Sequence, residues 1–149
     1  MRRRRIDALL FDYGASHTTR GNLACHAAGI TLIVLGILSM LQALPVAGVW
    51  TASEVLIAAG VLFYLALDLR LGLAVARAAV LLDLAARWIG DWRVGAAAFA
   101  LGWIFQAIGH GIYEKNSPAF FRNLVHLLVG PAYLVNEALH IRPTGSTPK

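Results

Sequence analysis

The sequence predicts an all-α membrane protein, a polytopic helical bundle with four crossings and a re-entrant or kinked fifth segment. Of its 149 residues, 58% are hydrophobic and only 14% are charged, whereas a typical soluble domain carries about 25% charged residues. Several apolar stretches also approach the length of about 20 residues that a helix needs to cross a bilayer. We therefore expect residues 1–149 to form one domain whose surface is largely solvated by lipid.

The chain begins with the basic run Arg2, Arg3, Arg4 and Arg5, which supplies much of the net charge of +5. Basic clusters beside apolar spans commonly fix membrane orientation, so we expect no nucleic-acid partner. Asp7 and Asp12 interrupt the following stretch, which argues against a cleaved signal peptide. Ile6, Leu9, Leu10 and Tyr13 recur at helical spacing. Residues 1–18 are therefore expected to form a short helix at the membrane interface.

Five apolar segments follow, at residues 23–44, 53–69, 71–90, 94–113 and 120–140. Pro45 ends the first segment, and Thr51 with Ser53 can cap the second. Asp83 and Arg87 interrupt the third segment, but their spacing of four residues allows them to pair on one helix face. No segment shows the period-2 pattern of a β-strand, and residues 142–149 read as a flexible tail.

Other residues support helices that pack closely in a membrane. The tryptophans expected at span ends are Trp50, Trp88 and Trp92, as in an aromatic belt. The glycines expected to allow close helix approach are Gly36, Gly60, Gly95 and Gly102. In the fifth segment Pro131 removes a backbone hydrogen bond and should break or kink the helix. A re-entrant hairpin there would return Glu137 and His140 to the level of His126.

Polar side chains in such apolar helices need partners, because each costs a few kcal/mol in lipid. Gln106, His110 and Glu114 follow one another at intervals of four and so share one helix face. Imidazole and carboxylate together suit iron or zinc, and two histidines with one carboxylate are typical of non-haem Fe(II) sites. The alternative is that His110 and Glu114 only satisfy each other across a packing surface.

Ligands of one ion must meet at one membrane level. His26, near the start of the first span, can meet His110 only if residues 71–90 also cross, since the core is about 30 Å thick. We therefore expect a multi-pass protein, of a bacterial inner membrane, with both termini and the site on the cytoplasmic side.

The polar residues belong to two longer motifs. The first is Tyr13-x3-His17-x4-Asn22-x3-His26. The second runs from Gly102 to Ala119 as Gly-Trp-Ile-Phe-Gln-x2-Gly-His-x3-Glu-Lys-x2-Pro-Ala, and Asn123-Leu124-Val125, Pro131 and Glu137 follow it. In these motifs the chain resembles, over residues 10–141, the 2-hydroxy fatty acid dioxygenases of the fungal endoplasmic reticulum and their bacterial relatives.

This resemblance implies an Fe(II)-dependent enzyme that uses O2 to remove one carbon from 2-hydroxy fatty acids, a step in sphingolipid degradation. It implies His17, His26 and His110 as iron ligands and catalytic residues, with Glu114 next and His126 as an additional ligand. The residues interpreted as orienting the histidines are Tyr13, Asn22, Gln106 and Glu137. Arg20 or Lys115 is expected to pair with the substrate carboxylate, or simply to reach the interface.

The sequence departs from the family pattern at Arg20 and Thr31, where prolines are common, and at His126, where fungal members tend to have glutamine. Two other functions stay open at this point. One is a haem b electron carrier with two histidine ligands. The other is a small ion transporter, because proton relays also use intramembrane glutamate and histidine.

Overall fold

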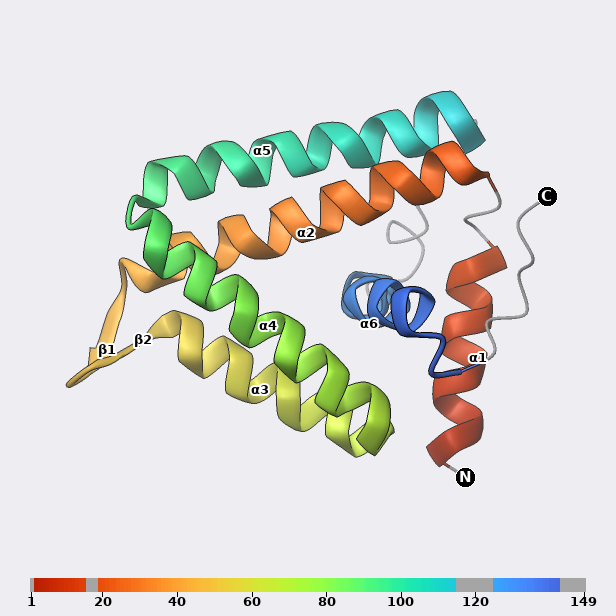
Figure 1. Ribbon diagram of the computed structural model, residues 1–149, viewed down its shortest axis with the longest axis horizontal. Helices are drawn as coiled ribbons and strands as arrows, with labels where there is room; N and C mark the ends of the chain where they lie inside the picture. Colours follow the sequence, from red (N-terminus) through yellow and green to blue (C-terminus); the bar gives the residue numbers. More distant parts are fainter. Residues whose placement is uncertain (1, 16–18, 115–124, 143–149) are drawn as a thin grey trace.

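The computed structural model describes residues 2–15, 19–114 and 125–142, without the side chains of residues 2–5, 114, 125 and 126. The described chain is almost wholly helical, as expected (Figure 1). Its elements are α1 Arg2–Ala15, α2 Arg20–Gln42, β1 Pro45–Ala47, β2 Trp50–Thr51, α3 Ala52–Leu67, α4 Leu69–Ile89, α5 Trp92–Ile108, the π-helical turn η1 Gly109–Glu114, and α6 Val125–Leu139. The predicted helices therefore exist, with ends shifted by a few residues.

Helices α2 and α5 lie side by side, and the α3–α4 pair lies next to them (Figure 1). Glycines make this closeness possible. A Cβ on Gly36 would lie 2.5 Å from the Gly95 carbonyl oxygen, and one on Gly102 would lie 2.7 Å from the Gly29 carbonyl oxygen. The expected packing role is confirmed for these glycines but is wrong for Gly60, where a Cβ would meet no atom of the described residues within 4 Å.

Asp68 separates α3 from α4. Its extended backbone (φ −155°) ends α3, and its carboxylate accepts the Leu71 backbone N–H (2.9 Å), which caps α4. Gly90 ends α4 in the left-handed conformation (φ +66°), and the Asp91 carboxylate then accepts the Arg93 backbone N–H at the start of α5. Short polar caps thus replace loops, which forces neighbouring helices to run antiparallel.

A two-stranded antiparallel sheet, β1 and β2, joins α2 to α3. The expectation of no strand was wrong here. Strands of three and two residues are too short to display a period-2 pattern, and Gly48 with positive φ (+57°) makes the turn. Val49 and Trp50 project from this hairpin with 86% and 60% of their surface exposed.

Helix α6 is seen almost end-on in Figure 1, between α1 and the other helices. It continues as one helix through Pro131, so the expected re-entrant break is wrong. The buried core that it shares with α1, α3 and α4 consists of Ile6, Leu10, Tyr13, Tyr64, Leu71, Val75, Val129, Ala132 and Tyr133. The α1 residues predicted to face the membrane interface therefore include three that pack inside the protein.

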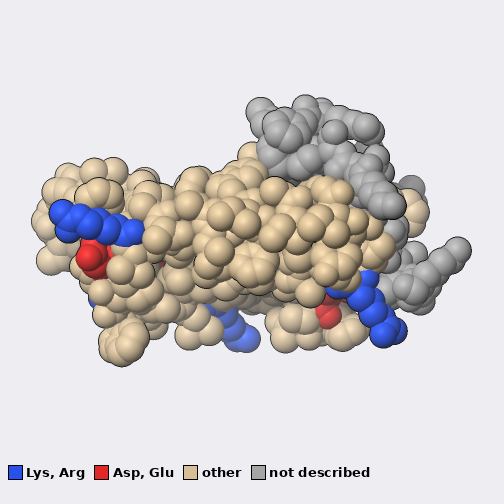
Figure 2. Space-filling model, turned by 90° about the horizontal axis from the view of Figure 1, so that it is seen from above, with Lys and Arg blue, Asp and Glu red and all other residues tan. Residues whose placement is uncertain are grey.

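Two described helical segments are long and apolar enough to cross a membrane, Arg20–Gln42 and Trp92–Tyr113. The apolar helices Ala52–Leu67 and Leu127–Leu139 are shorter. The face seen in Figure 2, on the α5 side of the bundle, is a broad expanse without acidic or basic side chains except toward its ends and rim. Membrane association rests on these features, whereas the four crossings stay a prediction.

Two networks of charged side chains join elements of the described bundle. At one end Arg87 pairs with Asp83 (3.0 Å), as the four-residue spacing predicted, and also with Glu54. In the second network the Arg142 guanidinium, after α6, contacts the carboxylates of Asp7 on α1 (2.7 Å) and Asp68. Burial by itself would raise the pKa of Asp68, but the Leu71 N–H and Arg142 outweigh it and lower that pKa. Arg142 thus ties three parts of the fold together.

Candidate functional site

The antiparallel pairing of α2 and α5 brings two histidines together. His26 lies in the second turn of α2, and His110 lies in the π-helical turn that follows α5. Their Nε2 atoms are 3.0 Å apart, their rings are nearly perpendicular (87°), and each residue is only 4% exposed. Two buried imidazole nitrogens therefore face each other at one end of the helix pair.

Tyr13 reaches this pair from α1. Its hydroxyl forms a hydrogen bond with His26 Nδ1 (3.3 Å), and its ring packs against Tyr133 of α6. Burial, and secondarily the nearby Tyr133, raises the pKa of Tyr13 above its ordinary value, so the phenol stays neutral. When His26 carries its proton on Nδ1, that N–H donates to the Tyr13 oxygen and the Nε2 lone pair points toward His110.

The π-helical turn depends on Gly109. A Cβ at this position would lie 2.5 Å from Asn22 Oδ1 and 3.1 Å from Cys25 Cβ, so only glycine lets η1 approach α2 so closely. Asn22 is fully buried beneath this contact. π-Helical turns within α-helices are frequent at functional sites. The prediction from spacing missed this turn, although the triplet Gly109-His110-Gly111 was its signal.

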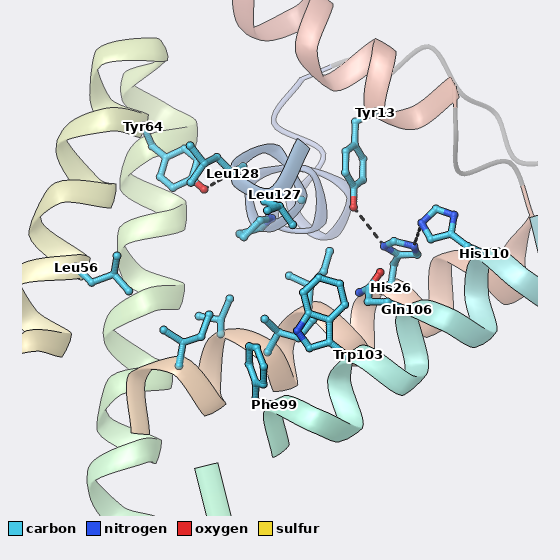
Figure 3. Close-up of a pocket in the computed structure, with 16 residues that line it drawn as sticks. Tyr13, His26, Leu56, Tyr64, Phe99, Trp103, Gln106, His110, Leu127 and Leu128 are labelled. Atoms are coloured by element: carbon cyan, nitrogen blue, oxygen red, sulfur yellow. Dashed lines mark hydrogen bonds between the residues drawn. The ribbon is translucent and has the colours of Figure 1, made fainter. Parts of the chain in front are cut away.

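A cavity of about 450 Å³ opens from the histidine pair into the bundle. Tyr13, His26, Gln106 and His110 line one end, and apolar side chains from α2, α3, α5 and α6 line most of the rest. Figure 3 shows Leu56 and Tyr64 across the cavity from the histidines. The Tyr64 hydroxyl donates to the Leu128 carbonyl oxygen (2.5 Å), so this hydroxyl already has a hydrogen-bond partner within the protein. The cavity is therefore polar at one end and mainly apolar beyond it.

Gln106 lines the same cavity one helical turn before His110. The residue is 6% exposed, and its Nε2 makes no hydrogen bond within the part of the chain that the structure describes. The structure thus places this amide beside the histidines but shows no hydrogen bond from it to either ring, so the orienting role predicted for Gln106 stays a prediction.

Several of the other predicted site residues are not described by the structure. His17 and Lys115 lie outside the described residues, as do the side chains of Glu114 and His126. Arg20 is exposed at the start of α2.

Glu137 does not line the cavity. On the unbroken α6 it lies seven residues beyond Gly130, roughly 10 Å along the axis, while Gly130 is the residue that adjoins the Tyr13 hydroxyl. The structure therefore does not bring Glu137 to the histidines. His140 ends α6 with a left-handed backbone (φ +51°), exposed to solvent.

Among the described residues, no group of three histidine, cysteine, aspartate or glutamate side chains is arranged to hold a metal ion. The described site offers two imidazole nitrogens that converge on one point, with Tyr13 behind one of them. Imidazole is a preferred ligand of iron and zinc, and a hydrogen bond to the outer ring nitrogen is the usual support of a ligating histidine. The donor set fits a metal ion of this kind.

Comparison with known proteins gives the family of this chain. The family model described as 2-hydroxy-palmitic acid dioxygenase Mpo1-like matches residues 4–141. The chain belongs to this family. It is 32% identical over 129 residues to the 2-hydroxy-palmitic acid dioxygenase MPO1 of Saccharomyces cerevisiae, a match that covers 83% of this chain and 72% of the yeast protein. No solved structure matches the chain.

The Mpo1-like region contains the whole cavity, because its match begins before Tyr13 and ends after α6. The histidine pair, the tyrosine behind it and the apolar chamber are thus parts of one family domain. The family likeness indicated in the sequence by the Tyr13–His26 and Gly102–Ala119 motifs is confirmed.

Proposed function

We propose that this protein is an Fe(II)-dependent membrane dioxygenase that converts a 2-hydroxy fatty acid to the fatty acid one carbon shorter. The observation that carries the proposal is a buried pair of imidazoles at the polar end of a mainly apolar cavity. Membership in a family described by 2-hydroxy-palmitic acid dioxygenase activity gives it a reaction.

The shape and polarity of the cavity suit an acyl chain. Its volume of about 450 Å³ falls within the range of about 300–1,000 Å³ typical of small-molecule sites. A methylene chain would be stabilised beside Ile33, Val34 and Ile37 by removal from water, at about 0.8 kcal/mol per CH₂. The acid and hydroxyl groups would then lie at the end that holds His26 and His110.

The reaction balances with dioxygen as its only oxidant. The C1–C2 bond of the 2-hydroxy acid breaks, C1 leaves as carbon dioxide, and C2 becomes the new carboxyl carbon. The substrate loses four electrons in this change, and one O2 accepts them, with one water as the remaining product. No reductant is needed.

His26 and His110 would hold the iron, and the candidates for further ligands are His17, Glu114 and His126. Iron bound there would supply the activation of dioxygen next to the C1–C2 bond. Tyr13 would hold the His26 ring in the tautomer that leaves Nε2 free to bind. The apolar walls would exclude water from the reacting end of the substrate.

The haem alternative fits the geometry less well. Histidines on opposite faces of a haem iron place their ligating nitrogens roughly 4 Å apart, about twice a metal–nitrogen bond of 2 Å. His26 Nε2 and His110 Nε2 are closer than that and their rings meet edge to face, which leaves no space for a porphyrin between them.

Membrane attachment is part of the proposal. Segments Arg20–Gln42 and Trp92–Tyr113 have the length and composition of spans, and exposed apolar side chains such as Leu101 and Ile104 face outward from α5. The histidine end would lie near the cytoplasmic interface, where a fatty acid carboxylate can stay hydrated while its chain enters from the bilayer.

The test uses the full-length protein, purified in detergent and loaded anaerobically with Fe(II). We expect oxygen uptake with 2-hydroxypalmitic acid and formation of pentadecanoic acid in equal amounts. His110→Ala should lose bound iron and at least 99% of the rate, because a metal ligand is removed. His140→Asn is the matched control, since residue 140 is exposed and asparagine tolerates its left-handed backbone.

Oxygen uptake that is absent with every 2-hydroxy acid, or stoichiometric iron retained by His110→Ala, would contradict the proposal. Ion flux in proteoliposomes without oxygen uptake would instead favour the transporter.

A further inference from the structure

The amide of Gln106 is a buried polar group for which the described protein provides no partner at Nε2. A buried polar atom without a hydrogen bond is unfavourable by about 1–3 kcal/mol, and native proteins keep few of them. Leucine at this position would be similar in volume and would carry no such penalty. The amide therefore calls for a partner that is not part of the described chain.

The surroundings of Gln106 indicate where that partner would lie. The residue lines the cavity together with His110, which follows it in η1, and Figure 3 shows its side chain close to the His26 ring. Gly29 on α2 makes room for it, because a Cβ there would lie 2.8 Å from Gln106 Nε2. The amide is thus held at the boundary between the imidazoles and the apolar chamber.

The chemistry of an amide selects the kind of group that it binds. An amide can donate and accept, and so can a hydroxyl, which makes the two a reciprocal pair. A carboxylate only accepts, and its charge is best matched by a cation. No lysine or arginine is among the described residues that line the cavity. A neutral hydroxyl is therefore the better partner for this neutral, buried amide.

We infer that Gln106 is the residue that recognises the 2-hydroxyl group of the substrate and so distinguishes 2-hydroxy fatty acids from unsubstituted ones. This inference rests on the proposed function and adds a specificity-determining residue to it. Sites built to hydrogen-bond a substrate hydroxyl reject analogues that lack it, because the analogue leaves a buried polar group unpaired. Gln106 would supply that discrimination before any chemistry takes place.

The experiment measures binding to the full-length protein in lipid nanodiscs, by displacement of a fluorescent fatty acid. Palmitic acid and 2-hydroxypalmitic acid are compared on the wild type, on Gln106→Leu and on Gln106→Glu, each with and without a chelator. We expect the wild type to prefer the hydroxy acid about tenfold or more, which corresponds to about 1.4 kcal/mol. Gln106→Leu should bind both acids equally, with its palmitic acid affinity unchanged or higher.

Stability separates recognition from a structural role. Removing an unpaired buried amide should leave the melting temperature of Gln106→Leu unchanged or raise it, whereas loss of a packing contact would lower it. Gln106→Glu keeps an acceptor but loses both N–H donors, so its preference for the hydroxy acid should fall at least severalfold.

The outcomes also separate this inference from the proposed function. A wild type that binds neither acid would overturn both. Oxygen uptake with 2-hydroxy acids, together with a Gln106→Leu variant that keeps the full preference, would overturn only the role of Gln106. A preference that disappears in Gln106→Leu with and without chelator would support the assignment, because metal chelation by the hydroxyl could not account for it.

Discussion

Nε2 of His26 and Nε2 of His110 lie 3.0 Å apart, although 84 positions separate the two histidines in the chain. Their meeting depends on antiparallel packing of α2 and α5, which places the start of one helix beside the end of the other. In a buried setting one of these nitrogens must donate to the other, or both must turn their lone pairs to a shared cation. The second arrangement is the basis of the proposed iron site.

Removing the hydroxyl behind His26 should weaken metal binding. In Tyr13→Phe the ring of His26 loses its hydrogen bond at Nδ1, and loss of such a support typically lowers metal affinity about 10–100-fold. Competition with a coloured chelator would measure this. Tyr64→Phe also removes a phenol from the cavity wall, at the far end, and should leave metal affinity unchanged. Equal metal affinity of Tyr13→Phe and the wild type would contradict the supporting role of Tyr13.

A single methyl group at position 109 should disturb the site. In Gly109→Ala the new Cβ would lie 2.5 Å from Asn22 Oδ1, so η1 or α2 must move. A misplacement of about 1 Å can cost roughly 100-fold in rate, and we expect a loss of at least tenfold in oxygen uptake. Gly111→Ala is the control, because a Cβ there meets no atom within 4 Å in the part of the chain that the structure describes. Similar rates for the two variants would contradict the importance of this contact.

The depth of the cavity should limit the length of the acyl chain. Leu56 lines the cavity across from the histidines (Figure 3), so Leu56→Trp should fill part of the chamber. When rates are compared across a chain-length series, we expect the preferred 2-hydroxy acid to become shorter by about two or more carbons. The large indole ring would occupy space that the end of the acyl chain fills in the wild type. Leu62→Trp, at an exposed position outside the cavity lining, should keep the wild-type preference.

The Arg142 network should make the stability of the fold depend on pH. The folded state lowers the pKa of Asp68, so its carboxylate stabilises the fold above its ordinary pKa of about 3.9, and this contribution is lost as the pH falls through the lowered value. Asp68→Asn should reduce stability at neutral pH by about 1–3 kcal/mol, with a smaller effect for the more exposed Asp7→Asn. Thermal unfolding of both variants from about pH 7 to about pH 3 would measure this.

The difference between wild type and Asp68→Asn should shrink toward the acid end, since protonation of Asp68, first in the unfolded chain and then in the folded protein, removes the contribution of its carboxylate. A difference that stays constant over the whole range would show that ionisation of Asp68 contributes little to stability.

Several features followed from the sequence because they depend on local chemistry. The helices are specified by long apolar runs, and the start of α3 by the predicted cap at Thr51. The Asp83–Arg87 pair followed from four-residue spacing on one helix. The motifs around His26 and His110 indicated the family, which the comparisons confirm. All of these signals lie within short stretches of chain.

The features that the sequence did not reveal depend on contacts between distant segments. Spacing treated Gln106 as a partner of the histidines, whereas packing against Gly29 places its amide at the cavity. Gly60 and Gly36 look alike in the sequence, yet only Gly36 faces a neighbouring backbone. Pro131 suggested a break, but α6 continues through it. The sequence by itself determined the helices, their caps and the family, because those signals are local. Only the tertiary structure decided which polar groups meet and that Gln106 Nε2 has no hydrogen-bond partner among the described residues, because this depends on how helices pack across the bundle.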